Sequence, residues 1–315
     1  MAKILFIDSN HSALHEALEA AGFTCDLQYT WDRKKILQEL PAYEGIVIRS
    51  RIKIDRELID HAANLKFIAR AGAGMENIDT VYAESKGIRC LNSPEGNRDA
   101  VGEHTLGMLL ALLNNITKAD RELKQGLWLR EENRGTEICG KTIGIIGYGN
   151  MGSAFAQRLA GFGATVLAYD KYKKNFSDRW VKEASPEQLF DTADIISLHL
   201  PLTDETRYLV NREYIQKFKK NIYIVNTSRG EVVKTDELVE QLKKGKVSGA
   251  CLDVLEYESP SFEQLNPEQM PEPMRYLLQS DRVLLTPHIA GWSYESHEKI
   301  AKVLAGKIRV LYGLE

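Results

Sequence analysis

The chain of 315 residues contains no long hydrophobic run. No stretch reaches the roughly 20 apolar residues that cross a bilayer. Asp8 comes too early for the apolar segment of a signal peptide. Cysteine is also scarce, and the four cysteines form neither a CxxC pair nor a zinc-like spacing with histidine. We therefore expect a soluble, cytoplasmic protein with reduced cysteines, mostly in apolar core positions, and with no metal.

The sequence also lacks a strong excess of charge, because its formal net charge is −3. Proteins that bind nucleic acid or a membrane surface usually carry a basic face, and this composition offers none. The hydrophobic fraction of 43% is ample for buried cores, and the length suggests two domains. We expect a small-molecule partner, with neither nucleic acid nor membrane.

The chain does contain a regular alternation of strand-like and helix-like segments. Five short apolar runs in residues 1–92 are separated by helical stretches, and six more alternate in the same way between residues 141 and 288. A long helical stretch over residues 98–128 separates the two series. Such alternation indicates parallel sheets with right-handed crossovers. The predicted fold class is α/β, with two doubly wound parallel-sheet domains.

A glycine-rich loop gives the strongest functional signal. Gly147, Gly149 and Gly152 have G-x-G-x-x-G spacing between an apolar strand and a helix, and Asp170 ends the next strand. This is the dinucleotide fingerprint, in which the backbone and the helix N-terminus receive a pyrophosphate. Asp170 would bind the adenosine ribose and repel a 2′-phosphate, which favours NAD over NADP. Three lysines within the next four residues weaken this preference.

Three polar residues follow strands of the second series. They are Arg229 in NTSRG, Glu258 in LDVLEYES and His288 in TPHIAG. Strand carboxyl ends line the ligand crevice of a doubly wound sheet, and a nicotinamide enzyme needs an acid or base and a group that holds the substrate. Each residue alone could be structural: a surface ion pair, a solvated loop carboxylate or a turn histidine. Their occurrence together beside a nucleotide fingerprint favours catalysis.

The motifs GYGNMG, HLPLT, NTSRG, LDV and TPHIAG, in this order, resemble those of the D-isomer-specific 2-hydroxyacid dehydrogenases. The resemblance implies that Arg229 binds the substrate carboxylate and polarises its carbonyl. It makes His288 the general acid in reduction and the base in oxidation, with Glu258 as a partner that favours imidazolium. The family commonly has proline directly after this glutamate, whereas Ser259 stands here. Glu256 therefore remains an alternative partner.

The resemblance also implies further site residues, with NAD as the cofactor. The cofactor-binding positions are Gly147, Gly149, Asn150, Met151, Gly152, Asp170, His199, Pro201, Thr206, Thr227, Ser228, Asp253 and Gly291. Asp253 would bind the nicotinamide carboxamide. The substrate-binding positions are Arg49, Ser50, Arg51, Ala73, Gly74, Asn97 and Arg130, with Arg134 as a further candidate.

The same resemblance implies an inserted domain. A Rossmann NAD-binding domain, residues 97–288, would interrupt a flavodoxin-like substrate domain formed by residues 1–96 and 289–315. The C-terminal helix would then return to the N-terminal sheet. The two crossings would form the hinge of a closing cleft.

Two stretches resemble the D-3-phosphoglycerate dehydrogenases within the family. They are IRSRIKID, with Arg49 and Arg51, and WLREENRGTEICGKTIGIIGYG, with Arg130 and Arg134. Guanidinium groups suit a phosphate dianion, although surface arginines are common and two adjacent glutamates offset part of the charge. The favoured reaction is oxidation of D-3-phosphoglycerate to 3-phosphohydroxypyruvate, as in serine biosynthesis. Because the chain ends at Glu315, we expect a short form without a regulatory domain.

Two alternatives stay open. A glycerate, hydroxypyruvate, glyoxylate or other 2-ketoacid reductase would carry the same motifs. A protein of another class, an NADH-sensing corepressor that binds partner peptides, retains much of the same site. Turnover of a 2-keto acid with NADH distinguishes an enzyme from such a binding protein.

The helical stretch over residues 98–128 predicts a homodimer. Its apolar run from Leu106 to Leu113, together with Ile116, is too long for one small domain to cover. An exposed patch of this kind usually marks an interface. The family resemblance favours the same assembly.

Overall fold

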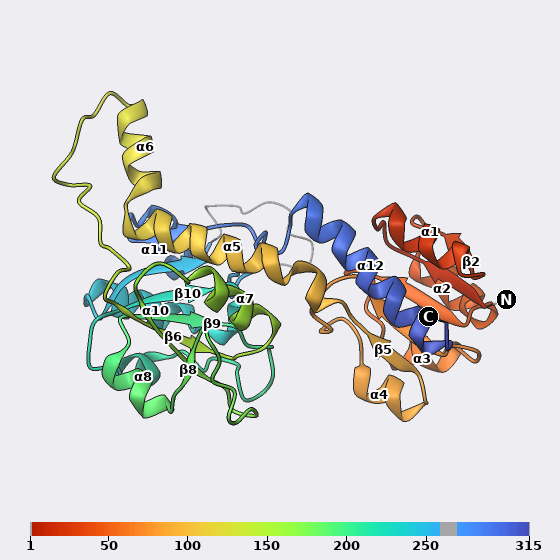
Figure 1. Cartoon of the computed structure of the whole chain (residues 1–315). Coiled ribbons are helices and arrows are strands. Elements are labelled where there is room, and N and C mark those ends of the chain that lie inside the picture. The colour runs from red at the N-terminus through yellow and green to blue at the C-terminus, as the bar shows by residue number, and fades with distance from the viewer. Residues whose placement is uncertain (1, 259–269, 315) are drawn as a thin grey trace. The chain divides into compact units, whose positions relative to one another are not determined.

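The computed structural model describes residues 2–258 and 270–314, and the chain divides into two compact units (Figure 1). One unit comprises residues 1–98 and 292–315, and the other comprises residues 99–291. Within the described residues, the first unit holds a five-stranded sheet and the second a seven-stranded sheet, both parallel. The predicted α/β fold class is confirmed.

The sheet of the first unit has the order β2-β1-β3-β4-β5, which is the flavodoxin-like order of doubly wound folds. Its strands are β1 (Lys3–Phe6), β2 (Thr24–Leu27), β3 (Gly45–Ile48), β4 (Phe67–Arg70) and β5 (Arg89–Leu91). Its helices are α1 (Ser12–Ala20), α2 (Arg33–Glu39), η1 (Leu40–Ala42), α3 (Arg56–His61), α4 (Thr80–Ser85) and α12 (Tyr294–Leu311). Helices α2, α3 and α4 each begin after an aspartate whose carboxylate accepts an amide of the first turn, and such caps set where a helix begins.

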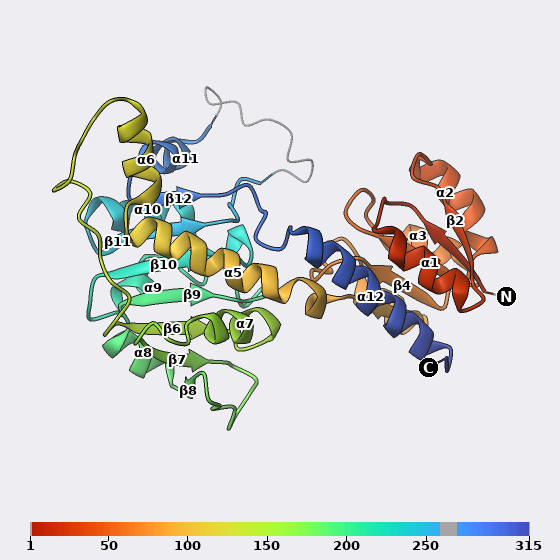
Figure 2. The same cartoon turned by 45° about the horizontal axis from the view of Figure 1, so that its top comes forward.

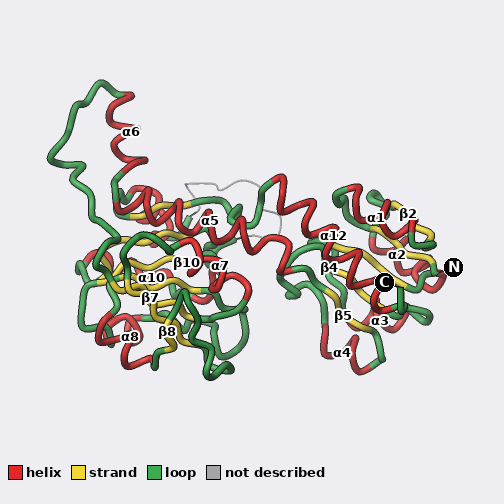
Figure 3. The backbone as a smooth tube through the Cα atoms, viewed as in Figure 1, coloured by secondary structure: helices red, strands yellow, loops and turns green. Residues whose placement is uncertain are grey.

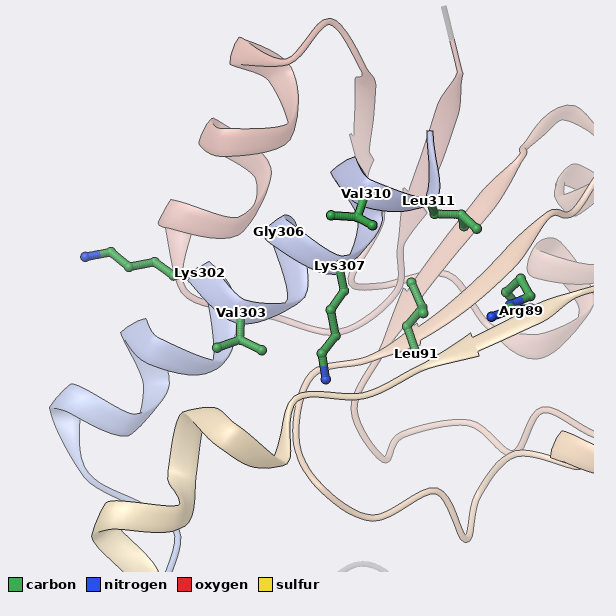
Figure 4. A pocket seen from close by; sticks show the side chains of 8 residues that line it. All are labelled: Arg89, Leu91, Lys302, Val303, Gly306, Lys307, Val310 and Leu311. Atoms are coloured by element: carbon green, nitrogen blue, oxygen red, sulfur yellow. The ribbon is translucent and has the colours of Figure 1, made fainter. Parts of the chain in front are cut away.

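The C-terminal helix α12 packs on this first sheet. Its Leu304 and Ile308 are buried in one cluster with Ile4 and Phe6 of β1. A groove of about 470 Å³ lies between α12 and the edge strand β5 (Figure 4), and the Lys307 side chain extends along it. The Lys307 ammonium group lies 2.9 Å from the Asn92 carbonyl oxygen and from the Glu95 carboxylate. The last helix is therefore fixed by both apolar and ionic contacts to the N-terminal part of the chain.

The sheet of the second unit has the order β12-β11-β10-β9-β6-β7-β8. Its strands are β6 (Thr142–Ile146), β7 (Thr165–Tyr169), β8 (Lys182–Glu183), β9 (Ile195–Leu198), β10 (Ile222–Asn226), β11 (Val247–Leu252) and β12 (Val283–Leu285). Its helices are α6 (Ile116–Lys124), α7 (Asn150–Arg158), α8 (Pro186–Thr192), α9 (Arg212–Gln216), η2 (Gly230–Val232), α10 (Thr235–Lys243) and α11 (Glu272–Gln279). Helix α5 (Pro94–Leu113) begins in the first unit and continues into the second.

Helices cover both faces of this second sheet (Figure 3). Alternate residues of a strand point to opposite faces, so Ile224 of β10 packs with Leu238 of α10, whereas its neighbour Val225 packs with Leu109 of α5. Figure 2 shows α5 running alongside these strands. Burial on both faces explains why the strands read as nearly continuous apolar runs.

The expected helical stretch over residues 98–128 is divided into α5 and α6. Asn115, between them, has a left-handed backbone with φ of 52°. The expectation of an exposed run from Leu106 to Leu113 was wrong: Met108 and Leu109 are buried against the sheet. The exposed apolar side chains lie instead on α6 and just after it, where the chain projects from the sheet (Figure 1). They are Ile116, Leu123, Leu127, Trp128 and Leu129.

All four cysteines are free. Cys251 is buried in β11, and burial raises the pKa of its thiol above the ordinary range. Burial also raises the pKa of Cys25 to about 12 and that of Cys90 to about 11. The cysteines were expected mostly in core positions, but Cys25 and Cys90 are half-buried and Cys139 is exposed in the loop before β6.

The described residues were also searched for membrane spans. Over residues 2–258 and 270–314, no helix combines the length and the apolar character needed to cross a bilayer.

Candidate functional site

The glycine loop between β6 and α7 is built by close backbone contacts. Gly147 has φ of 92°, and a Cβ atom there would lie 2.4 Å from the His199 carbonyl oxygen. A Cβ atom on Gly152 would lie 2.1 Å from the Gly147 carbonyl oxygen, so α7 can pack this close only with glycine. Gly149 is different, because a Cβ atom there would meet nothing within 4 Å. The loop is thus tight against the protein at two glycines and open at the third.

The N-terminus of α7 is available to an anion. Gly149 is its N-cap residue, and no side chain caps the first turn, which contains Asn150 and Met151. Amides of an uncapped first turn, with the helix dipole behind them, form a ready phosphate site.

Asp170 follows β7 and is held beside the glycine loop. Its carboxylate accepts the amides of Tyr148 at 2.9 Å, Tyr172 at 3.0 Å and Lys173 at 3.1 Å. Burial works to raise the pKa of Asp170, but these three amide donors outweigh burial and keep the pKa below its usual value. The side chain is therefore a fixed, ionised acceptor.

Two of the lysines after Asp170 are engaged by other groups. The Lys171 ammonium group lies 2.6 Å from Glu205, in the loop after β9. The Lys173 ammonium group donates to the Tyr148 carbonyl oxygen at 2.6 Å. Their charge is thus partly compensated within the second unit. The two lysines are therefore less able to attract the 2′-phosphate of NADP.

The loop after β9 carries the predicted positions His199, Pro201 and Thr206. His199 is half-buried, and its Nε2 lies 2.9 Å from Ser197 Oγ. Its Nδ1 atom is buried and has no hydrogen-bond partner among the described residues. Burial lowers the pKa of His199 to about 3, so the ring is neutral. The Thr206 hydroxyl donates to the Pro201 carbonyl oxygen at 2.6 Å, which closes the loop on itself.

Arg229 follows β10 in a turn that Asn226 holds together. The Asn226 amide donates to the Arg229 carbonyl oxygen at 2.8 Å, and its own oxygen accepts from the amide and the hydroxyl of Ser228 at 3.0 and 2.7 Å. The next residue, Gly230, packs on the segment after β11, because a Cβ atom there would lie 2.1 Å from the Leu255 backbone. The Arg229 turn therefore lies directly against the segment that carries Glu258.

His288 follows β12, the neighbour of β11. Its Nδ1 lies 2.9 Å from Oε2 of Glu258, and its backbone is left-handed with φ of 54°. Glu256, the alternative partner, has its carboxylate 2.9 Å from the Thr235 amide at the start of α10. The structure thus pairs His288 with Glu258. Ser259, which departs from the family pattern, lies outside the described residues.

Asp253 is almost completely buried and binds groups of the protein itself. Its carboxylate accepts the Thr286 hydroxyl at 2.6 Å and the amides of Ile289 and Ala290 at 2.8 and 2.9 Å. Burial works to raise its pKa, but the His104 imidazole 3.5 Å away and the hydrogen bonds from Thr286 and the two amides outweigh burial, so the pKa lies below its ordinary value. The residue expected to reach the nicotinamide carboxamide therefore also organises the loop after His288.

Sequence reasoning missed two neighbours on α5. His104 Nε2 lies 3.1 Å from Thr286 Oγ1, and Thr105 Oγ1 lies 3.0 Å from Thr227 Oγ1. The Thr105 hydroxyl donates to Val101 in its own helix at 2.6 Å, so Thr227 is the donor between the two threonines. The sequence signal was the pair of polar residues, His104 and Thr105, directly before the apolar run that begins at Leu106.

The predicted substrate positions Arg49 to Arg51, Ala73, Gly74 and Asn97 all lie in the first unit. The Arg49 guanidinium lies 5.0 Å from the centre of the Trp292 ring. The Arg51 guanidinium donates to the carbonyl oxygens of Ile7 at 2.6 Å and Trp31 at 2.8 Å, which gives it a structural use.

The other predicted substrate positions differ in their surroundings. The Ala73 carbonyl oxygen accepts the Asn92 amide at 2.6 Å. The side-chain oxygen of Asn97 is buried and finds no hydrogen-bond partner in the part of the chain that the structure describes. Arg130 is exposed in the second unit, in the loop after α6, and Arg134 is paired with Glu131. Ser50 and Gly74 are exposed and half-buried positions in loops of the first unit.

The second unit fits a dinucleotide. An open glycine at an uncapped helix N-terminus suits a pyrophosphate, and the fixed carboxylate of Asp170 suits the ribose hydroxyls. Both follow neighbouring strands, β6 and β7. In the parts of the chain that the structure describes, no cluster of three or more His, Cys, Asp or Glu side chains is placed to hold a metal.

Comparison with known proteins agrees with this geometry. Residues 106–290 match the family model described as D-isomer specific 2-hydroxyacid dehydrogenase, NAD binding domain. The chain is 39% identical over 277 residues to a hydroxypyruvate reductase of Thermotoga maritima, and the match covers 88% of this chain and 87% of that protein. It is 36% identical over 308 residues to a D-3-phosphoglycerate dehydrogenase of Archaeoglobus fulgidus. That match covers 97% of this chain but only 56% of the relative's length.

Solved structures give the same result for the fold. A D-lactate dehydrogenase from Aquifex aeolicus, complexed with NAD and lactic acid, superposes with a TM-score of 0.83 and 30% sequence identity. The superposition covers 99% of this chain and 95% of that chain.

The environment of Asp170 predicts a preference for NADH over NADPH. We expect Asp170→Ala to reduce the ratio of the two kcat/KM values about tenfold or more, because a charge-assisted hydrogen bond to the ribose is lost and the repulsion of a 2′-phosphate disappears. Steady-state kinetics with each cofactor measure this ratio. Asp204→Ala, a change at an exposed acid in the loop after β9, is the control. Equal kcat/KM values for both cofactors in the unmodified protein would contradict the prediction.

Proposed function

Because the chain belongs to the D-isomer-specific 2-hydroxyacid dehydrogenase family, an NAD-dependent class of oxidoreductases, we propose that Arg229, Glu258 and His288 form its catalytic group. The observation that carries this proposal is the 2.9 Å contact between His288 Nδ1 and Glu258, next to the turn that holds Arg229. The three segments follow the adjacent strands β10, β11 and β12.

In this proposal His288 transfers the proton. Glu258 accepts the hydrogen on Nδ1, so the tautomer is fixed and Nε2 is the atom that can face a substrate oxygen. In reduction, Nε2–H gives its proton to the carbonyl oxygen as the carbon receives hydride. In oxidation, Nε2 takes the hydroxyl proton, and the adjacent carboxylate stabilises the imidazolium that forms. The nicotinamide of bound NAD supplies or accepts the hydride.

Arg229 binds the carboxylate of the 2-keto or 2-hydroxy acid in this proposal. Its planar guanidinium can form two parallel hydrogen bonds to a carboxylate, which orients the carbon beside it. The turn around Asn226 supports this role, because it fixes the Arg229 backbone before substrate binds. The positive charge would also polarise the neighbouring carbonyl in the transition state.

Loss of the His288 imidazole should remove most of the turnover. We expect His288→Ala to lower kcat by about 10²–10⁴, because general acid–base catalysis typically contributes this factor, while NADH affinity stays close to that of the unmodified protein. Steady-state kinetics and NADH fluorescence titration measure the two quantities. His61→Ala, at an exposed histidine of the first unit, is the matched control. Near-normal turnover by the His288 variant would exclude this mechanism.

The finer substrate proposal is that the acid carries a phosphate, as in oxidation of D-3-phosphoglycerate. It is supported by the match to D-3-phosphoglycerate dehydrogenases and by the positive charge around Arg49. The rings of His11 and His297 are 5.5 Å apart, and burial, Arg49 and His11 all lower the pKa of His297. Positive groups around His297 disfavour its protonation, and the same groups would attract a bound anion. The matches to hydroxypyruvate and glyoxylate reductases support the alternative, a 2-ketoacid reductase of the same family.

Paired substrates and single arginine variants test for the phosphate. We expect Arg49→Ala and, separately, Arg130→Ala to raise KM for phosphohydroxypyruvate about tenfold or more, because each loses a charge-assisted contact of roughly 1.5–3 kcal/mol. KM for hydroxypyruvate should change much less. Arg56→Ala, an exposed arginine paired with Asp79, is the control. Equal effects on both substrates, with hydroxypyruvate used as efficiently, would contradict a phosphate subsite.

We also propose a homodimer that uses the exposed apolar side chains of α6 and the following loop. Trp128 is 77% exposed and Leu123 55%, and apolar groups of this size rarely face water without a partner. Sedimentation should give a dimer at micromolar concentration, and Trp128→Glu together with Leu123→Glu should shift it to monomer, because two charges would have to be buried. Leu314→Glu, at an exposed leucine of the first unit, is the control. A monomeric unmodified protein would rule the proposal out.

A further inference from the structure

We propose that His104 is a positioning residue for the catalytic histidine, because through Thr286 and Asp253 it holds the segment that carries His288. This inference rests on the proposed role of His288 as general acid and base. It concerns contacts that lie wholly within residues 99–291, the second unit.

The backbone at His288 needs external support. Its φ of 54° is in the left-handed region, where the Cβ atom crowds the backbone of a residue that is not glycine. The His288 amide donates to the carbonyl oxygens of Asp253 at 2.7 Å and Thr286 at 3.0 Å. Such a conformation persists only where the surroundings determine it.

The carboxylate of Asp253 supplies most of that support. It accepts the amides of Ile289 and Ala290, the two residues directly after His288, and it is only 1% exposed. Each carboxylate oxygen therefore accepts one of these amides. Together the two hydrogen bonds fix the backbone directly after His288. Moving the carboxylate would move the loop and the imidazole with it.

His104 fixes the position of this carboxylate through Thr286. The Thr286 hydroxyl donates its hydrogen to Asp253 Oδ1 at 2.6 Å, so its oxygen is left as an acceptor. His104 Nε2, 3.1 Å from that oxygen, must then carry the hydrogen and donate it. Nε2 also lies 3.5 Å from Asp253 Oδ1. His104 thus donates to the Thr286 hydroxyl oxygen, and the Thr286 hydroxyl donates to the Asp253 carboxylate.

Helix α5 makes His104 a rigid support. One turn further along, Met108 and Leu109 are buried in the core with strands β6, β10 and β11. A side chain on a packed helix holds its partners more accurately than one on a loop. A leucine at position 104 would leave the Thr286 oxygen without this donor beside a buried carboxylate, and such groups are costly when they lose a partner.

Kinetics and binding of matched variants test the inference. We expect His104→Leu to lower kcat about tenfold, because small displacements of a reacting group have large effects on rate. The Kd for NADH, measured by fluorescence titration, should change less than about twofold. His104→Gln should recover most of kcat, because its amide can donate to the same oxygen. Thr286→Val should lower kcat in the same way, and the double variant His104→Leu/Thr286→Val should lose no more than the worse single variant, as expected for groups that act as one unit.

His61→Leu is the control for replacing a histidine by leucine, since His61 is exposed and its Nδ1 contacts the Glu57 carbonyl oxygen of its own helix. Normal kcat in His104→Leu would overturn the inference, and so would a Gln variant as poor as the Leu variant. A parallel loss of NADH affinity would also overturn it, because it would indicate general disruption. If His104→Leu does not fold, Thr286→Val decides alone, and its kcat must fall. Failure of the proposed function would appear in the unmodified protein, as no turnover of any 2-keto acid, before any variant is compared.

Discussion

The buried carboxylate of Asp253 is the constraint that sets the local geometry around His288 and Glu258. A charge removed from water must find donors inside the protein, and here two backbone amides and one threonine hydroxyl of the loop after β12 supply them. The demand for those donors sets the path of the loop. That path forces His288 into a left-handed backbone, and the same path places its imidazole against Glu258. The donors that the buried carboxylate requires thus determine how the His288 imidazole is oriented beside Glu258.

The order of the strands separates two tasks along one sheet edge. Residues suited to the dinucleotide follow β6, β7 and β9, whereas Arg229, Glu258 and His288 follow β10, β11 and β12 on the other side of β9. Because all the strands are parallel, both groups occur at the same edge. Close backbone contacts keep each group compact: Gly152 lies on Gly147 in the first, and Gly230 lies on Leu255 in the second. Only glycine fits at Gly152 and Gly230, because a Cβ atom at either position would overlap neighbouring backbone atoms.

Sequence reasoning predicted what local patterns and family motifs carry, such as the parallel sheets, the glycine loop and the strand-end residues. It did not find His104, because its partner Thr286 is 182 positions away and no local pattern links them. It treated the run from Leu106 to Leu113 as exposed, because an apolar helix face does not reveal what covers it. The hydrogen bonds of Arg51 were not foreseen for a similar reason: the carbonyl groups of Ile7 and Trp31 become its neighbours only when the chain folds.

The placement of the cysteines makes one of them, Cys139, selectively reactive toward thiol reagents. Thiolates, not thiols, react with alkylating reagents, so a buried thiol with a raised pKa reacts slowly. Cys251 is buried and Cys25 and Cys90 are half-buried, and all three thiols have a raised pKa, whereas Cys139 is exposed just before β6. A maleimide dye or spin label added near neutral pH should therefore modify Cys139 first. The native sequence would then carry a single reporter in the loop that leads into the nucleotide-binding strand, without any engineered cysteine.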